Sequence, residues 1–249
     1  MHRIDKLILT LLSQGSVWSR LGSKVTVVEF LDKIGGPGMD ADMARAMERI
    51  LKKQHMEFKL KTKVIGGDTS SPDKITISTE PVGGGDPDTI DTDVVLVAIG
   101  RRPYTYGLGL ENIGLETDER GRIVIDQEYR TNIPHIRVIG DVTFGAMLAH
   151  KVILTRFGRS VGFNITNRFL PYQQAEEEGI AAVEYISRGY GHVNYGAIPS
   201  VMYTYPEAAW VGQTEQEVIA SARPYSVGTF PFSANSRAKT NLETDGMVK

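Results

Sequence analysis

Two short apolar runs constrain the fold of this chain more than any other feature. Residues 24–30 read KVTVVEF and residues 93–99 read DVVLVAI, and each run has the length of one strand. Runs that are apolar at nearly every position are typical of strands buried on both faces of a parallel sheet. Between them, the residues from Asp40 to Gln54 repeat apolar side chains at helical spacing, which predicts an amphipathic helix. Alternating strands and helices favour an α/β architecture with parallel strands.

Further elements are predicted along the rest of the chain. Four more strands are expected at residues 56–64, 74–79, 122–125 and 136–139, and one more amphipathic helix at residues 175–187. Residues 16–21 resemble the end of a helix that stops at Gly22. The apolar residues 7–12 form either an extension of that helix or a surrogate strand beside residues 24–30, and local sequence does not decide between these alternatives.

Composition excludes several classes of protein and site. With 249 residues the chain is long enough for one large domain or two smaller ones. A formal net charge of −2 and the lack of a long apolar run predict a soluble protein without a nucleic-acid or membrane partner. The chain contains no cysteine, which excludes a disulfide framework, a thiolate zinc site and a thiol redox centre within these residues.

Glu29 stands at the end of the first apolar run, where an acid can contact a cofactor. In a dinucleotide-binding unit a carboxylate at this position accepts hydrogen bonds from the adenosine ribose hydroxyls. A solvated charge at a strand exit is the simpler explanation of Glu29 alone. The glycine fingerprint that should precede such an acid is missing, because residues 1–14 contain no glycine.

A second acid, Asp141, follows the predicted strand at residues 136–139. A Gly-Asp pair at a strand end presents its carboxylate to a ribityl or ribose hydroxyl, or it caps the helix that follows. Here Thr131, Pro134 and Ile136 precede Gly140 in the pattern T-x-x-P-x-I-x-x-I-G-D. This longer pattern favours the cofactor contact.

Six segments in a fixed order resemble one family. They are residues 15–30 (GSVWSRLGSKVTVVEF), 94–103 (VVLVAIGRRP), 131–142 (TNIPHIRVIGDV), 147–151 (MLAHK), 175–186 (AEEEGIAAVEYI) and 199–212 (PSVMYTYPEAAWVG). With these motifs the chain resembles the flavin-dependent pyridine nucleotide–disulfide oxidoreductases, and within them the dihydrolipoamide dehydrogenases. The resemblance covers nearly all of residues 15–249 except the block 152–174.

The resemblance implies cofactor contacts, and it implies no catalytic residue and no metal ligand in this chain. Glu29 would hold the adenosine ribose of NAD, Val64 would line the adenine pocket, and Gly100 would pass close to the nicotinamide side. Asp141 would bind the ribityl chain of FAD. Four residues would lie along the flavin ring, namely Met147, Leu148, Ala149 and His150.

The implied fold class is α/β, an incomplete flavoprotein with two dinucleotide-binding domains. Residues 16–100 correspond to a Rossmann-like NAD-binding domain that lacks its first strand. Residues 101–191 correspond to the C-terminal part of the FAD-binding domain, and residues 192–249 to the start of an α+β dimerisation domain.

Two segments have no counterpart in the family, residues 1–15 and residues 152–174. The second interrupts what the family builds as one helix. It carries only basic charges, begins with Val and ends in Gln-Gln, and we interpret it as a translated, retained intron. We expect it to form an irregular or weakly helical excursion.

The implied activity is the oxidation of dihydrolipoyl groups to lipoyl groups through a cysteine pair and FAD, with NAD as acceptor. The implied partners are the lipoyl-bearing proteins of 2-oxoacid dehydrogenase complexes and a second copy in a homodimer. The implied location is the mitochondrial matrix, although the chain shows no convincing targeting segment.

Three parts of the family's machinery have no counterpart in these residues: the cysteine pair, the NAD glycine motif and the C-terminal His-Glu pair. Thiol–disulfide exchange requires a thiolate, so we expect these residues to be inactive by themselves. Two alternatives stay open, a fragment without catalytic function and a regulatory module that docks on an intact subunit.

Overall fold

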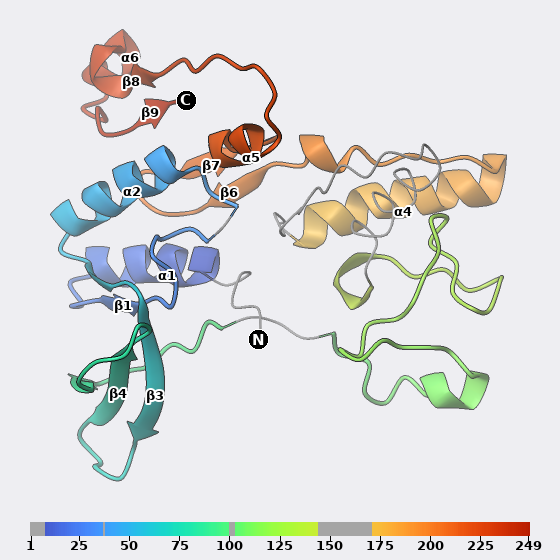
Figure 1. The fold of residues 1–249 in the computed structure, drawn as a ribbon, viewed down its shortest axis with the longest axis horizontal. Coiled ribbons are helices and arrows are strands. Elements are labelled where there is room, and N and C mark those ends of the chain that lie inside the picture. Colours follow the sequence, from blue (N-terminus) through green and yellow to red (C-terminus); the bar gives the residue numbers. More distant parts are fainter. Residues whose placement is uncertain (1–7, 37, 100–102, 144–170) are drawn as a thin grey trace. The chain divides into compact units, whose positions relative to one another are not determined.

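The computed structural model of the chain describes residues 8–36, 38–99, 103–143 and 171–249 (Figure 1). The chain divides into two compact units, one made of residues 1–100 and 201–249 and the other of residues 101–200. Each unit has its own cluster of buried apolar side chains. The chain therefore leaves the first unit after residue 100 and returns to it after residue 200.

The first described element is a helix, so residues 8–12 extend the predicted helix and do not form a surrogate strand. Helix α1 spans Ile8–Arg20. It is followed by Gly22, whose φ of +96° is a conformation that glycine adopts without steric strain. Leu12 is completely buried in the first core. The predicted helix end is thus confirmed.

Two serines of α1 bind the backbone of the segment that follows residue 200. Ser13 Oγ accepts a hydrogen bond from the N–H of Tyr203 at 3.1 Å, and Ser16 Oγ accepts one from the N–H of Tyr205 at 3.2 Å. Ser16 is completely buried. These bonds satisfy backbone donors and join the first and last parts of the first unit.

The centre of the first unit is a strand–helix–strand arrangement with parallel strands. Strand β1 (Thr26–Val28) pairs in parallel with β2 (Glu57–Lys59), and helix α2 (Ala41–Lys53) lies between them in sequence. The side chain of Asp40 caps α2 by accepting the N–H of Asp42 at 2.9 Å. The predicted strand, helix and parallel pairing are confirmed.

The core of the first unit gathers apolar residues from both ends of the chain. Its completely or almost completely buried members include Leu12, Val27, Ile34, Met39, Leu51, Met56 and Met202. Burying one such side chain contributes about 1.5–3 kcal/mol relative to leaving it exposed. Helix α2 contributes a full face to this core, which explains its strict helical spacing of apolar residues.

An antiparallel sheet extends from this core. Strands β3 (Thr62–Asp68), β4 (Ile75–Pro81) and β5 (Asp88–Thr92) form it in sequence order. The predicted strand at residues 56–64 is therefore two strands, β2 and β3. They are separated near Lys61, which has a φ of +49°. The two strands need different partners, because β2 pairs in parallel and β3 antiparallel.

The prediction of a buried strand at residues 93–99 is wrong. These residues form no strand, and Val94, Val97 and Ile99 are 79%, 69% and 68% exposed. Only Ala98 is buried among them. A strand requires a neighbouring backbone edge, and in the described residues the parallel sheet consists of β1 and β2 alone. Apolar composition therefore did not suffice to form this strand.

The second unit has less regular backbone than the sequence predicts. The strands expected at residues 122–125 and 136–139 are isolated bridges, Ile123 to Thr143 and Arg130 to Arg137. The unit also contains the short 3₁₀ helices η1 (Leu110–Ile113), η2 (Gly140–Val142) and η3 (Tyr195–Ala197). Side chains such as Ile123 remain buried, so the apolar pattern predicted burial correctly and regular pairing incorrectly.

Helix α4 spans Pro171–Arg188, which confirms the helix predicted at residues 175–187. The helix begins four residues earlier than predicted, with proline at a position that tolerates the loss of an N–H. Residues 171–174 of the inserted block therefore belong to α4. The rest of that block, residues 152–170, lies outside the described residues.

The C-terminal part of the first unit consists of short elements. They are β6 (Ser200–Met202), β7 (Ala208–Trp210), α5 (Glu215–Ala220), β8 (Phe230–Pro231), η4 (Phe232–Ala234), α6 (Ser236–Thr240) and β9 (Met247–Val248). Strand β6 pairs with β7 and β8 with β9. Thr214 and Glu217 form a capping box at the start of α5. Among the helices that the structure describes, none is long and apolar enough to cross a bilayer.

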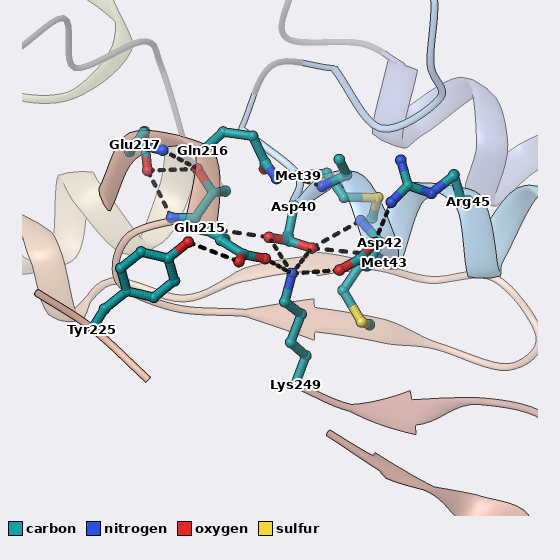
Figure 2. A network of polar contacts seen from close by, with 12 residues as sticks. Met39, Asp40, Asp42, Met43, Arg45, Glu215, Gln216, Glu217, Tyr225 and Lys249 are labelled. Atoms are coloured by element: carbon teal, nitrogen blue, oxygen red, sulfur yellow. Dashed lines mark hydrogen bonds and ion pairs between the residues drawn. The ribbon is translucent and has the colours of Figure 1, made fainter. Parts of the chain in front are cut away.

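A polar network joins α2, α5 and the end of β9 (Figure 2). The ammonium of Lys249 lies 2.9 Å from Asp40 Oδ1, 2.7 Å from Asp42 Oδ2 and 2.5 Å from Glu215 Oε2. Burial alone would lower the pKa of Lys249, but its hydrogen bonds to these carboxylates outweigh burial and raise the pKa. Tyr225 donates a hydrogen bond to Glu215 Oε1 at 3.0 Å. The network therefore holds together segments that are far apart in sequence.

Candidate functional site

Three of the eight predicted cofactor-contact residues lie in the described part of the chain. Glu29 and Val64 belong to the first unit and Asp141 to the second. The other five lie outside the described residues: Gly100, Met147, Leu148, Ala149 and His150. In the described ranges, no group of three or more His, Cys, Asp and Glu side chains is arranged to hold a metal ion.

Asp141 lies in a tight turn, and its side chain is exposed. The preceding residue, Gly140, is buried and has a φ of +78°, which favours glycine. A Cβ at this position would lie 3.2 Å from the Cβ of Ala175 in α4, a tight contact. The turn is closed by the N–H of Thr143, which donates to the carbonyl of Gly140 at 3.1 Å. Glycine is therefore required here both by conformation and by the approach of α4.

A buried carboxylate supports this turn from α4. Glu178 is 0% exposed, and its Oε2 accepts the N–H of Gly140 at 2.7 Å. Its Oε1 accepts the hydroxyl of Tyr195 at 3.0 Å. The hydroxyls of Tyr195 and Tyr129 lie 3.3 Å apart. The Gly140–Asp141 turn is thus connected to a buried chain of polar groups.

Burial determines the protonation of these tyrosines. Desolvation, followed by the hydrogen bond with Tyr129, raises the pKa of Tyr195 well above its ordinary value. Desolvation also raises the pKa of Tyr129. Both phenols therefore remain neutral and keep their protons for hydrogen bonding.

Glu29 directly follows β1, and it is not the solvated charge that its position alone suggests. The residue is 2% exposed, and its Oε1 accepts the N–H of Leu31 at 2.7 Å. Its own backbone continues the pairing with the neighbouring strand, because its N–H donates to the carbonyl of Lys59 at 2.9 Å. The carboxylate thus stabilises the turn after β1.

Val64 lies in β3 opposite Thr79, beside an irregularity in the register between Val64 and Gly66. Its side chain is 55% exposed, and that of Ile65 is 49% exposed. An exposed apolar side chain of this kind is available to a flat apolar partner such as a base.

The sequence analysis did not single out Glu178 within the helix predicted at residues 175–187. The signal was present, because Glu178 shares a helical face with Ala181, Ala182 and Tyr185 at spacings of three, four and seven residues. The alanines are buried in the second core. An acid on the core face of an amphipathic helix needs buried hydrogen-bond partners, and these include the N–H of Gly140 and the hydroxyl of Tyr195.

Curated relatives are similar to this chain over almost all of its length. The dihydrolipoamide dehydrogenase of Chaetomium thermophilum is 60% identical over 238 residues, which are 96% of this chain and 42% of the relative. The mitochondrial dihydrolipoyl dehydrogenase of Schizosaccharomyces pombe is 54% identical with the same coverage. The human mitochondrial enzyme is 48% identical over 94% of this chain and 42% of its own length. The chain therefore spans less than half the length of these relatives.

Solved structures share the fold. The HOCl-induced flavoprotein disulfide reductase RclA from Escherichia coli superposes with a TM-score of 0.72 at 26% identity, covering 94% of this chain and 47% of that one. LpdA from Mycobacterium tuberculosis superposes with a TM-score of 0.67 at 21% identity, covering 96% and 46%. At 21% identity, the second similarity supports the fold alone.

Family models match both ends of the chain. The model described as pyridine nucleotide-disulphide oxidoreductase matches residues 12–155, more than half of the chain. The model of the dimerisation domain of the same family matches residues 198–249. The fold class is accordingly α/β, and the chain corresponds to part of a two-domain flavoprotein fold. The chain belongs to the pyridine nucleotide-disulphide oxidoreductase family.

Proposed function

We propose that the chain is part of a dihydrolipoyl dehydrogenase, which oxidises dihydrolipoyl groups to lipoyl groups with NAD as acceptor. The observation that carries this proposal is the 60% identity to a dihydrolipoamide dehydrogenase over 96% of the chain. The dimerisation-domain match supports a homodimer. The mitochondrial names of relatives support the mitochondrial matrix, and the proposed partners are the lipoyl-bearing proteins of 2-oxoacid dehydrogenase complexes.

The domain organisation is part of the proposal. Residues 16–100 would form most of an NAD-binding domain, residues 101–191 the returning part of an FAD-binding domain, and residues 192–249 the start of a dimerisation domain. The family matches at residues 12–155 and 198–249 support this order.

FAD fits the turn at Asp141, where an exposed carboxylate offers acceptor oxygens to the hydroxyls of a ribityl chain. The glycine before it leaves room for α4 to approach and fixes the direction of the chain. Met147, Leu148, Ala149 and His150 would lie along the flavin ring. When bound, FAD supplies the electron transfer, and these residues bind and orient it.

NAD fits the described residues less well. Glu29, Val64 and Gly100 are the proposed contacts, but the carboxylate of Glu29 is buried and already accepts the N–H of Leu31. A ribose hydroxyl reaches Glu29 only after this side chain is uncovered. The buried conformation of Glu29 in this structure therefore does not fit the proposed ribose contact.

The residues of this chain contribute no thiolate, because the 249 residues contain no cysteine. Thiol–disulfide exchange with a dihydrolipoyl group proceeds only by attack of a thiolate. We propose that these residues bind cofactor without exchanging electrons with dihydrolipoyl groups by themselves. A docking module for an intact subunit is the second candidate function, and the dimerisation-domain match favours it.

The test is an absorbance spectrum of the purified chain after incubation with FAD and desalting. We expect a protein-bound flavin band, and we expect that dihydrolipoamide added without oxygen leaves the band unbleached. A colourless protein would contradict cofactor binding by these residues. If dihydrolipoamide bleaches the band, the proposal that electron exchange needs a cysteine thiolate outside these residues is contradicted.

A further inference from the structure

Glu178 occupies a place where an apolar residue would cost less. It lies on the core face of α4 with Ala181 and Ala182, and it is 0% exposed. Burying a carboxylate costs more than burying an alkyl group unless the carboxylate is hydrogen-bonded. Packing of α4 therefore does not explain an acid at this position, and its two hydrogen-bonded oxygens point to another role.

One hydrogen-bond partner of Glu178 is the backbone N–H of Gly140, the residue immediately before the proposed FAD contact Asp141. Glu178 Oε2 accepts the N–H of Gly140 at 2.7 Å across 38 residues of sequence. Gly140 has no side chain and adopts many backbone conformations, so its own chemistry does not select the φ of +78°. A fixed acceptor on a helix does select it. The direction of the next residue, Asp141, follows from that choice.

A second set of contacts fixes the acceptor itself. Tyr195 donates its hydroxyl to Glu178 Oε1 at 3.0 Å, and Tyr129 lies within hydrogen-bonding distance of Tyr195. Tyr129 also packs edge-on against Tyr185 of α4, with ring centroids 6.2 Å apart. Because both of its oxygens are hydrogen-bonded and it is completely buried, the side chain of Glu178 has little rotational freedom.

We infer that Glu178 is a positioning residue, which holds the N–H of Gly140 so that Asp141 directs its carboxylate to the ribityl hydroxyls of the flavin. The inference rests on the proposed function and deepens it. In this inference α4 contributes to cofactor binding indirectly, through Gly140 and Asp141. It also predicts that Glu178 acts through geometry, so an uncharged side chain with one oxygen acceptor replaces it in part.

The first test needs no cofactor. In the chain labelled with ¹⁵N, the Gly140 amide proton should resonate far downfield and exchange slowly. Glu178→Leu should remove both signatures, whereas Glu178→Gln should keep them, because its amide oxygen still accepts the N–H. Glu177→Leu is the matched control, since Glu177 is exposed on the same turn of α4. An unchanged Gly140 amide in folded Glu178→Leu would overturn the inference. If Glu178→Leu does not fold, loss of both signatures in folded Glu178→Gln would overturn it instead.

The second test separates positioning from general stability. Relative to the Glu177→Leu control, Glu178→Leu should weaken FAD binding at least tenfold, and Glu178→Gln by less than threefold. Lumiflavin, which lacks the ribityl chain, should bind both Glu178 variants with wild-type affinity. Equal losses for FAD and lumiflavin would mean that Glu178 is merely structural and would overturn the inference.

The variant Asp141→Ala distinguishes failure of the inference from failure of the proposed function. If Asp141→Ala binds FAD as tightly as wild type, the ribityl contact is wrong and the proposed role of Glu178 fails with it. If Asp141→Ala binds weakly while Glu178→Leu binds normally, only the inference fails. Tenfold losses in both variants support both.

Discussion

At the scale of single residues, buried or half-buried acids with backbone partners decide much of this structure. Glu29 accepts the N–H of Leu31, Asp40 that of Asp42, and Glu178 that of Gly140. The sequence predicted the helix that Asp40 caps, because the apolar spacing of that helix is local. The partners of Glu178 that the structure describes, Gly140 and Tyr195, are 38 and 17 residues away, so only the folded chain shows them.

Removing the carboxylate of Glu29 should destabilise the first unit. Glu29→Ala leaves the N–H of Leu31 without this acceptor in a partly buried turn, which costs about 1–3 kcal/mol. Urea unfolding of the two proteins measures this difference. Asp32→Ala is the control, because Asp32 is an exposed acid three residues away, and it should change stability by less than about 0.5 kcal/mol. Equal effects of the two substitutions would contradict the buried role of Glu29.

The Lys249 network should produce a stability loss at acid pH. Burial alone would raise the pKa of Asp40, but its hydrogen bond to Lys249 and those from backbone N–H groups lower it below 3.8. A lowered folded-state pKa means that this stability is present above pH 3.8 and is lost as pH falls through the folded-state value. The raised pKa of Lys249 gives the opposite dependence: this stability is fully present below pH 10.5 and is lost as pH rises from there through the higher folded-state pKa.

Lys249→Met should remove the alkaline dependence and weaken the acid dependence, to which the backbone N–H groups of Asp42 and Glu215 also contribute. It should also lower the free energy of unfolding at neutral pH by about 2 kcal/mol, because charge-assisted hydrogen bonds are lost and three carboxylates are left close together. Unfolding curves between acid and alkaline pH measure the effect. Lys239→Met, at an exposed lysine of α6, is the control. Parallel pH profiles for wild type and Lys249→Met would exclude the network as their cause.

At the scale of elements, the sequence predicted helices better than strands. The determinants of helix α2 are local, because the Asp cap, the apolar spacing and the C-terminal Gln-His turn all lie within about fifteen residues. Strands depend on neighbours that local sequence does not specify. Residues 93–99 have a strong strand composition and no strand partner, and residues 136–139 form only a bridge at Arg137. The prediction therefore failed where pairing depends on distant residues.

The exposure of residues 93–99 has a direct consequence for mutation. Val97→Ala should change the free energy of unfolding by less than about 0.5 kcal/mol, because Val97 is 69% exposed. Val27→Ala is the matched substitution in β1, where the side chain is 1% exposed, and it should cost about 1–3 kcal/mol. A similar cost at both positions would show that residues 93–99 are buried in solution.

Helix α1 should contribute to the first core through its N-terminal half. Leu12→Ala should destabilise the chain by about 2–5 kcal/mol, since Leu12 is completely buried. Leu21→Ala, one residue beyond the helix and 71% exposed, should have little effect. Thermal or urea unfolding distinguishes the two. A negligible effect of Leu12→Ala would mean that α1 does not dock on the core.

At the scale of the whole molecule, two units with separate cores form one chain of a known family. The alternation of predicted strands and helices indicated the α/β class, and the order of the motifs indicated the family, because several motifs in one order are more specific than any single element. Five of the eight proposed contacts lie outside the described residues. The cofactor proposal therefore depends on the turn at Asp141 more than on any other described feature.

The most direct measurement is a calorimetric titration of FAD into the wild-type chain and into Asp141→Ala. Glu119→Ala serves as the control, because Glu119 is another exposed acid of the second unit. The proposed site predicts measurable binding to wild type and Glu119→Ala and at least tenfold weaker binding to Asp141→Ala. Equal affinities of all three proteins, or no binding by wild type, would contradict it.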